Sequence, residues 1–488
     1  NAPERWAELA QKLGWDKPEL ESRLARFNQR EFMYLVRHLP PHEAAQLLAM
    51  DVPGVYSQRE YRRYYPAGEV AAQLVGITDI DDRGQEGIEL AYDAWLAGES
   101  GARQVIKDLR GRTVRDLGLV RSARSGRSVA LSIDLRLQHL AHTELKKAVL
   151  ESGAKGGSVV VLDVATGEVL AMANHPSYNP NDRSRMSPGN LRNRALTDVI
   201  EPGSTVKPLA VLAALEEGIY HPHSVIDTSP GWIHISGKTL KDPVDYGVLN
   251  LSGVIAKSSQ VGMTKLALNT EPEVIRNMYY RMGLGQSTGT GFPGEALGVL
   301  PNYNRWQPIQ RATYAFGYGI NLTMLQLAQA YAVLASGGQK RPVSLLRTEG
   351  EITSEQVVSA QHTRAVMSML SKVVSQDGTA INAQVESYSV AGKTGTVHKV
   401  GSEGYIDNRY IASFAGMAPA KNPRIVTVVM VDEPSEMRYF GGQVAAPVFS
   451  SITGGALRLL QEPPENKSGK IIVRKQHDNV VDSGGPLS

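Results

Sequence analysis

The first strong pattern of apolar positions lies well inside the chain. A short β-rich run covers 128–133, and helical periodicity follows over 135–150. Two further apolar runs, 158–164 and 168–173, flank the turn residues 165–167, which predicts a β-hairpin. This stretch therefore predicts a strand, a helix and a hairpin, in that order.

A second strand-rich block lies far downstream, with Gly and Pro turns between its strands. The expected strands of this block cover 388–391, 410–415 and 425–431. Between the two blocks, apolar positions recur mostly with helical period, as in 209–217 and 324–335. Strands at both ends of a helical middle favour an α+β domain with a largely antiparallel sheet.

The N-terminal part has a different composition. Residues 1–124 are rich in Arg, Glu, Gln and Ala, and helix-period stretches occur at 18–27 and 41–50. They contain no constellation of reactive side chains, so we expect a non-catalytic docking or spacing module. Residues 125–462 then form the α+β domain, and 463–488, which are polar and lack periodicity, are expected to be a flexible tail.

Composition narrows the possible functions without choosing among them. With 488 residues, 42% hydrophobic and 21% charged, the chain is typical of a soluble globular protein of two or three domains. The formal charge of +3, without basic clusters among aromatics, excludes a nucleic-acid binder. Because there is no cysteine, disulfides, thiolate metal sites and a cysteine nucleophile are excluded as well.

Ser204 and Lys207 form an SxxK element whose surroundings favour a reactive serine. Glu201, Pro202 and Gly203 precede it as residues typical of a helix start, and the apolar helical run LAVLAALEE follows. On a helix, positions i and i+3 share a face, so the Lys207 amine can reach the Ser204 hydroxyl. The helix N-terminus also favours negative charge that develops nearby.

A single SxxK match is weak evidence, because ordinary Ser and Lys usage produces about one or two by accident in a chain of this length. A second match, Ser152 to Lys155, lies in the glycine-flanked sequence ESGAKGG, where no helix is expected to hold the two side chains together. A capping serine and a solvated lysine would explain Ser204 and Lys207 equally well if they stood alone.

Two further motifs follow in a meaningful order. KSSQ at 257–260 comes after the apolar run 251–256, and KTGT at 393–396 directly follows the strand-like run 388–391. SxxK, a Ser-rich middle motif and KTG, in this order, occur together in penicillin-binding proteins and class A β-lactamases. Agreement of all three makes chance an unsatisfactory explanation.

Acyl transfer by a serine needs a base, and the motif set contains no His/Asp pair. A lysine of lowered pKa is then the expected base, and we assign this role to Lys207. Burial lowers the pKa of a lysine, and a second cation lowers it further, so Lys393 in the same site would help to keep Lys207 neutral.

The chain resembles the class B penicillin-binding proteins, and among them most the division-specific (septal) transpeptidases of Gram-negative bacteria. The segments that carry the resemblance are NRALTDVIEPGSTVKP, TGEVLAMANHPSYNPN, GQEGIELAYDAWLAG, GRTVRDLG and YFGGQVAAPVF, which together extend over nearly the whole chain. The resemblance implies a transpeptidase domain of the penicillin-binding and serine β-lactamase type, with an antiparallel sheet and helices. It also implies an N-terminal pedestal-like module similar to a dimerisation domain.

The resemblance also implies roles for the motif residues. Ser204 would attack the carbonyl between two terminal D-alanines of a stem pentapeptide, and Lys207 would take its proton. Ser258 would relay a proton to the leaving D-alanine, and the backbone N–H groups of Ser204 and Thr396 would hold the oxyanion. No cofactor or metal is implied. The substrate-binding positions implied are Gln260, Lys393, Thr394, Gly395, Thr396, Tyr318, Tyr439 and Phe440. For the three aromatic residues, a purely structural core role fits equally well.

One position departs from the family pattern. The middle motif of the family is SxN, and its third position here is Gln260. Glutamine keeps the amide but displaces it by more than about 1 Å, a shift that can cost about a hundredfold in rate. We therefore expect either reduced activity or a pocket that has compensated.

Three related activities remain open. A β-lactamase would also hydrolyse the acyl-enzyme quickly, but no Glu-bearing deacylation element is identifiable and the large N-terminal module is foreign to such enzymes. A D,D-carboxypeptidase differs in using water as the acceptor. A non-catalytic β-lactam sensor, which Gln260 encourages, would be acylated but would never cross-link.

The resemblance further implies partners and a location. We expect the protein to act on peptidoglycan stem peptides, to be trapped by β-lactams, and to work with divisome proteins including a septal glycosyltransferase. A single N-terminal anchor in the inner membrane would hold the catalytic domain on the periplasmic face at the septum. No run of about 18 apolar residues occurs and no methionine precedes Asn1, so we expect the anchor upstream of these residues.

Overall fold

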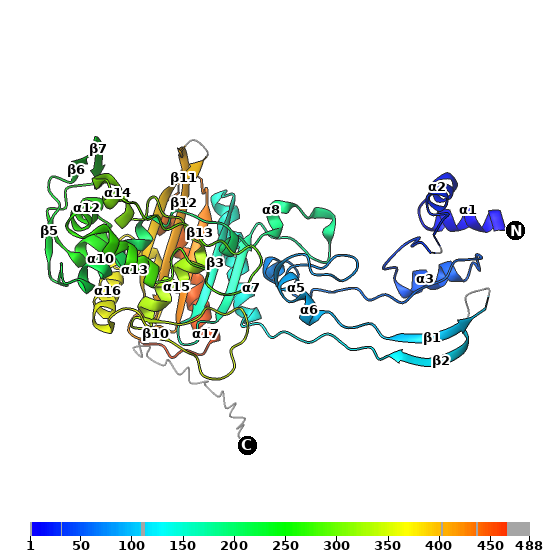
Figure 1. Cartoon of the computed structure of the whole chain (residues 1–488). Helices are drawn as coiled ribbons and strands as arrows, with labels where there is room; N and C mark the ends of the chain where they lie inside the picture. Colours follow the sequence, from blue (N-terminus) through cyan, green and yellow to red (C-terminus); the bar gives the residue numbers. More distant parts are fainter. Residues whose placement is uncertain (1, 31, 109–112, 402–403, 436–437, 466–488) are drawn as a thin grey trace, which may run out of the picture. The chain divides into compact units, whose positions relative to one another are not determined.

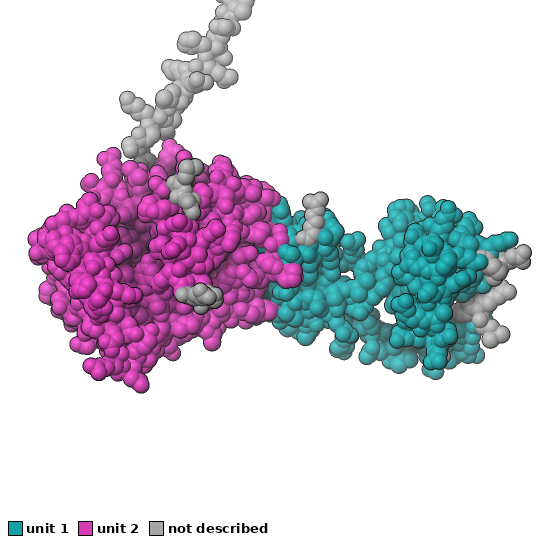
Figure 2. Space-filling view, turned by 90° about the horizontal axis from the view of Figure 1, so that it is seen from above, with its two compact units in different colours: residues 1–129, 178–187 teal, residues 130–177, 188–488 magenta. Residues whose placement is uncertain are grey.

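The computed structural model forms two compact units, which are coloured separately in Figure 2. The first contains Asn1–Val129 and Tyr178–Ser187, and the second contains Ala130–Ser177 and Pro188–Ser488. The residues that the structure describes are 2–30, 32–108, 113–401, 404–435 and 438–465. The tail predicted at 463–488 therefore lies outside the described residues from 466 onward. Within the described ranges, no helix is both long and apolar enough to cross a membrane.

A five-stranded antiparallel sheet forms the centre of the second unit, as the sequence predicts (Figure 1). Its order is β11-β12-β13-β3-β4, so strands from the two ends of the unit lie side by side. The strand β3 is buried along its whole length, which accounts for its nearly continuous apolar run. The bounds are β3 (Gly156–Asp163), β4 (Val169–His175), β11 (Ala391–Gly401), β12 (Gly404–Ala418) and β13 (Ile425–Asp432).

Two strand predictions need correction. The expected run 388–391 contributes only its last residue to β11, which continues through the KTGT motif to Gly401. The motif joins the strand because it pairs with Ala412–Ala415 of β12. The run 128–133 forms no strand, because it makes only an isolated bridge between Leu131 and Leu346.

Helices cover both faces of the sheet. On one face, α7 (Leu135–Ser152) and α17 (Gly441–Leu459) pack on each other and on the strands. The other face is covered by α15 (Met324–Ala335), which has a capping box at Thr323 and Gln326, and by the short helix α9 (Arg194–Thr197). The periodicities over 135–150 and 324–335 therefore predicted the right elements.

The helical half of this unit surrounds α10 (Lys207–Glu216). Its residues from Lys207 to Leu215 are all buried, as expected for a helix that is apolar on every side. Four helices of the described chain contact α10, namely α11 (Leu251–Lys257), α12 (Gln260–Asn269), α13 (Pro272–Arg281) and α16 (Ala360–Val373). A further helix, α14 (Pro308–Ala315), packs on α12. The smaller elements are α8 (Pro188–Leu191), β5 (Val225–Asp227), β6 (Trp232–Ile235), β7 (Lys238–Lys241), β8 (Val248–Asn250), β9 (Gln339–Lys340) and β10 (Glu355–Gln356).

The first unit consists of short elements. They are α1 (Ala2–Lys12), α2 (Lys17–Arg26), α3 (Pro41–Leu48), α4 (Ala72–Val75), α5 (Gly87–Ala91), α6 (Asp93–Leu96), β1 (Ala102–Lys107) and β2 (Thr113–Arg121). The helices expected at 18–27 and 41–50 are thus present as α2 and α3. Residues 178–187, which lie inside the predicted range 125–462, group with this unit. Here Asn181 bonds to both the N–H and the carbonyl of Tyr65, and Tyr178 donates to the Ala72 carbonyl.

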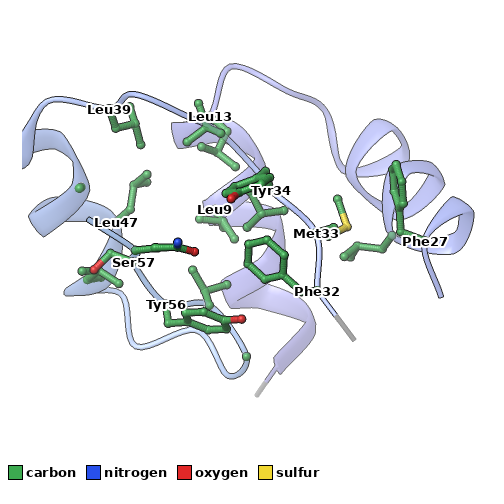
Figure 3. A pocket seen from close by; sticks show the side chains of 18 of the residues that line it. Leu9, Leu13, Phe27, Phe32, Met33, Tyr34, Leu39, Leu47, Tyr56 and Ser57 are labelled. Atoms are coloured by element: carbon green, nitrogen blue, oxygen red, sulfur yellow. The ribbon is translucent and has the colours of Figure 1, made fainter. Parts of the chain in front are cut away.

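A pocket of about 400 Å³ lies among the first 60 residues of this unit (Figure 3). Its labelled lining includes Leu9, Leu13, Phe32 and Tyr34, so it is mostly apolar. Leu9 is buried, whereas the rings of Phe32 and Tyr34 remain exposed. These residues contain none of the three motifs.

Candidate active site

Ser204 lies on a single 3₁₀ turn, Gly203–Val206, that leads directly into α10. The sequence had placed it at the start of the helix itself. In a 3₁₀ turn, positions i and i+3 eclipse, so Ser204 and Lys207 still share a face. Gly203 has a φ of 54°, and a Cβ there would meet the Val397 side chain at 2.2 Å, so the turn requires glycine at this position. The Ser204 hydroxyl has no hydrogen-bond partner among the described residues.

The Lys207 amine is buried, with its side chain inside the helical half of the unit. It donates to the Ser258 carbonyl at 2.6 Å and to Ser258 Oγ at 3.2 Å. Burial lowers the pKa of Lys207 to about 7, although the negative charge of Asp242 acts in the opposite direction. A substantial share of this amine is therefore neutral near pH 7 and can accept a proton.

Lys393 reaches the same place from the sheet. It is fully buried on β11, and its amine lies 3.0 Å from Ser258 Oγ, 3.2 Å from the Thr394 carbonyl and 3.3 Å from Thr394 Oγ1. Burial, together with the charge of Lys207, holds the pKa of Lys393 well below its ordinary value. The two lysines that the sequence selected thus converge on one serine hydroxyl.

Ser258 occupies a sharp turn between two helices. It ends α11 with a left-handed φ of 56°, and Ser259 begins α12 as its N-cap. Non-glycine residues adopt this conformation rarely, so the surrounding contacts must hold it in place. The turn directs the Ser258 hydroxyl toward both lysine amines.

Gln260 is the first residue of α12 and is half-buried. Its backbone N–H donates to Asp242 Oδ1 at 2.5 Å. Its side-chain amide makes no hydrogen bond within the described part of the chain. The amide is therefore available to a ligand, whereas the backbone at this position is held.

The KTGT residues line up along one edge of the sheet, since β11 is the first strand in the order. Thr394 Oγ1 lies 3.0 Å from Thr379 Oγ1, and Thr396 Oγ1 accepts a hydrogen bond from the Gly441 N–H at 3.0 Å. A Cβ on Gly395 would lie 2.3 Å from Ser413 Oγ, so this position also requires glycine.

Aromatic rings extend along the β11–β12 hairpin. Tyr439 stacks on Tyr410 with centroids 4.1 Å apart, and Phe440 lies beside Tyr439 at 4.4 Å. Phe440 is 51% exposed. Tyr318 is half-buried and contacts Tyr405 edge-on, with ring centroids 5.9 Å apart, and burial raises the pKa of its hydroxyl. Phe440 therefore has a surface available to ligands, while Tyr318 packs mainly within the protein.

Sequence reasoning missed two residues that hold this site. Asp242 accepts hydrogen bonds from the middle motif, and Glu201 accepts from the Gly319 N–H at 2.7 Å and from the Tyr405 hydroxyl at 3.1 Å. Their contacts are not visible locally, because their partners lie far away along the chain. The sequence marked Glu201 only as a residue typical of a helix start.

The second SxxK match has no such geometry. The Ser152 hydroxyl donates back to the Ala148 carbonyl within α7, and the Lys155 amine pairs with Glu433 at 2.8 Å. The Lys155 side chain is 63% exposed, whereas Lys207 is buried. Of the two matches, only Ser204–Lys207 combines a buried lysine amine with a serine hydroxyl that has no partner among the described residues. The Lys207 amine bonds to Ser258, and no hydrogen bond joins it to Ser204.

The chain is similar to known proteins along most of its length. The family description "Penicillin binding protein transpeptidase domain" matches residues 157–454, and "Penicillin-binding Protein dimerisation domain" matches residues 2–131. The probable peptidoglycan D,D-transpeptidase PbpC of Pseudomonas aeruginosa is 43% identical over 449 residues, which cover 92% of this chain and 80% of that protein. The peptidoglycan D,D-transpeptidase FtsI of Escherichia coli K12 is 43% identical over 462 residues, which cover 95% and 78%.

A solved structure of a related transpeptidase domain is also similar to this chain. The apo structure of the TP domain from Burkholderia pseudomallei penicillin-binding protein 3 has a TM-score of 0.64 and 43% sequence identity. The similarity covers 69% of this chain and 98% of that one.

Proposed function

This chain belongs to the penicillin-binding proteins that carry a transpeptidase domain, and from that premise we propose that Ser204 is the nucleophile of its reaction. The protein is a peptidoglycan D,D-transpeptidase related to the septal enzymes, and it binds β-lactams as well as peptidoglycan. The reaction has two chemical steps, acylation of the serine and transfer of the acyl group to an amine, and the groups around Ser204 suit both.

In the acylation step, the Ser204 hydroxyl attacks the carbonyl between the two terminal D-alanines of a stem peptide. Lys207, whose amine is partly neutral near pH 7, takes the proton. The backbone N–H groups of Ser204 and Thr396 stabilise the oxyanion. The C–N bond then breaks, and the proton that Lys207 took passes through Ser258 to the leaving D-alanine amine, which leaves Lys207 neutral again.

In the second step, the amine of a neighbouring stem peptide attacks the acyl-enzyme ester. The attacking amine gives a proton to the neutral Lys207, and Lys207 returns it to the Ser204 oxygen as the ester C–O bond breaks. The new amide bond is the cross-link. Lys393, Thr394 and Thr396 bind the carboxylate of the donor peptide before acylation. Because Gly395 has no side chain, the donor peptide can come close to the same edge of the sheet. The amide of Gln260 and the rings of Tyr439 and Phe440 contact the donor peptide. Tyr318, which is half-buried, supports the site through its contact with Tyr405.

The observation that carries this assignment is that Lys207, three residues after Ser204, and Lys393 on β11 bring two buried amines to the Ser258 hydroxyl. Lys207 and Lys393 approach Ser258 Oγ to 3.2 Å and 3.0 Å. Keeping both amines charged at this separation in a buried place would be costly, so one of them is best accommodated neutral. A neutral lysine beside a cationic one supplies a base and a carboxylate-binding group together.

Acylation by a fluorescent penicillin tests the nucleophile. We expect one covalent adduct, located on Ser204 by mass spectrometry, that persists over the time course. Ser204→Ala should abolish labelling and keep the fold, because a hydroxyl at a helix start contributes at most about 1 to 2 kcal/mol. Ser152→Ala, from the other SxxK match, is the matched control and should label normally.

Labelling that persists in Ser204→Ala contradicts the proposal, and rapid loss of the adduct would indicate a β-lactamase instead. A donor stem pentapeptide supplied with an acceptor amine then separates the remaining activities. A cross-linked product indicates transpeptidation, and release of D-alanine without it indicates a carboxypeptidase. Labelling without either product indicates a sensor.

The N-terminal residues 1–124 contain none of these groups, and we propose that they serve as a non-catalytic pedestal for the domain at 125–462. We further propose that the septal periplasmic enzyme is held by a single inner-membrane anchor and works with divisome proteins, including a septal glycosyltransferase. In support, the chain is 43% identical to the peptidoglycan D,D-transpeptidase FtsI of Escherichia coli K12. Fractionation of the full-length gene product tests the anchor, since a fully soluble product would contradict it.

A further inference from the structure

Asp242 lies directly after β7, in a loop that no motif includes. Its side chain is only 7% exposed, although aspartate is rarely buried without partners. Its carboxylate accepts from the Ser259 hydroxyl at 2.5 Å, from the Gln260 N–H at 2.5 Å and more weakly from the Val261 N–H at 3.4 Å. A single buried carboxylate thus holds three consecutive residues, two of them in the middle motif and the third in α12.

These contacts fix the geometry of the motif. Ser259 Oγ donates to Asp242 and at the same time accepts from the Gly262 N–H at 2.8 Å, so it caps α12 while it is tethered itself. Ser258 immediately precedes this tether and retains its left-handed conformation there. The position of the Ser258 hydroxyl between the two lysines therefore depends on a contact made one residue away.

Asp242 also affects the site through its charge. The groups that face the Lys207 amine are Ser258 at the end of α11, Lys393 on β11 and the ring of Phe316 after α14, whose centroid lies 5.8 Å away. Neither Ser258 nor Phe316 carries a negative charge that would balance the positive charge of the two amines. The negative charge of Asp242 favours the ammonium form of Lys207 and opposes the effect of burial.

We propose that Asp242 is a positioning residue of the transpeptidase site, which holds the middle motif against the two buried lysines and contributes a negative charge to the site. This inference rests on the proposed roles of Ser204 and Lys207. The positioning and the charge of Asp242 can be tested separately. Loss of positioning should lower the acylation rate at every pH, whereas loss of the charge should change how the rate depends on pH.

Three variants separate the two contributions. Asp242→Asn keeps the size and one acceptor oxygen but removes the charge. Ser259→Ala removes one tether and leaves the charge of Asp242 in place. Asp245→Asn is the matched control, because Asp245 lies in the same loop but its carboxylate accepts from the exposed Gly247 N–H.

The measurement is the second-order rate constant for acylation by a penicillin, taken across neutral pH. Removing a negative charge near an amine lowers its pKa, so the acidic limb of the Asp242→Asn profile should shift to lower pH. Loss of tight positioning should lower its plateau about tenfold. Ser259→Ala should lower the plateau by about the same factor without moving the limb. Asp245→Asn should change neither.

An Asp242→Asn limb that stays where the wild-type limb lies would overturn the electrostatic part and leave Asp242 as a cap only. An unchanged plateau in both Asp242→Asn and Ser259→Ala would overturn the positioning part. Thermal unfolding of each variant shows whether a loss of rate reflects a loss of fold. Persistent labelling of Ser204→Ala is a different result, since it removes the premise rather than the role of Asp242.

Discussion

The helix α10 and the first 60 residues of the chain bury their apolar side chains to very different degrees. Every residue of α10 from Lys207 to Leu215 is buried. Within the first 60 residues the structure buries only four apolar side chains among those it describes, namely Leu9, Ala10, Leu20 and Val52. The comparison shows where an unusual protonation state can exist. A lysine loses its charge near neutral pH only where packing excludes water on all sides, and α10 supplies that surrounding.

The largest expected effect concerns the base itself. Lys207→Ala should slow acylation by about 10²- to 10⁴-fold, the usual contribution of a general base. Lys393→Ala should also slow acylation strongly, because it removes an amine that binds the donor carboxylate and bonds to Ser258. Lys155→Ala, which changes an exposed lysine of the other SxxK match, should have no effect on the same labelling rate. Equal losses at Lys155 and Lys207 would show that burial does not distinguish them.

Two leucine substitutions compare how much packing stabilises each region. Leu212→Ala, in the buried face of α10, should lower the free energy of unfolding by about 2 to 5 kcal/mol, because it leaves a cavity. Leu48 at the end of α3 is 40% exposed, and Leu48→Ala should change stability by roughly 0.5 kcal/mol or less. Equilibrium denaturation of both variants gives the two values, and similar losses would remove the contrast between the regions.

Gln260 tests how strictly the packed site controls its ligand contacts. Because Asp242 holds the backbone of residue 260, the extra methylene displaces the amide from the place that an asparagine amide would take. Gln260→Asn should therefore raise the acylation rate by roughly ten- to a hundredfold, or about 1.4 to 2.7 kcal/mol. Rate constants for a penicillin with both forms decide the point. An unchanged or lower rate would mean that the pocket has adapted to glutamine.

The smallest expected effect is the change of the acylation rate with pH. Burial lowers the pKa of Lys207 to about 7, so the neutral form that accepts the Ser204 proton is lost as pH falls through that value. Below it, the acylation rate should fall about tenfold for each pH unit. A stopped-flow series with the wild-type protein measures this limb. A rate independent of pH from mildly acid to neutral conditions would contradict a buried lysine base.

Local pattern predicted most of the elements and the motif residues. The periodicity over 324–335 gave the bounds of α15, because an apolar face and a capping box act within one segment. The KTGT motif was placed after a strand instead of inside one, since pairing with β12 determines where β11 ends. Asp242 and Tyr405 were missed because they meet their partners only through the fold.

The same limit applies to the domain description. Residues 178–187 follow β4 in the sequence, and nothing in their composition indicates that they group with the first unit. The contacts between Asn181 and Tyr65 join segments that are far apart along the chain, which periodicity alone does not reveal. Local signals therefore identified the chemistry better than they identified which segments pack together.

The pairing of β13 with β3 has a consequence for the order in which the protein acquires its activity. Val428 lies opposite Val160, so the central sheet closes only after almost the whole second unit has been synthesised. Long-range pairings of this kind are slow, because the chain loses entropy before the contacts repay it. The nucleophile turn emerges early, but Lys393 arrives on a late strand. A nascent chain therefore carries Ser204, Lys207 and Ser258 before it has Lys393, and we expect the enzyme to become acylable only at the end of folding.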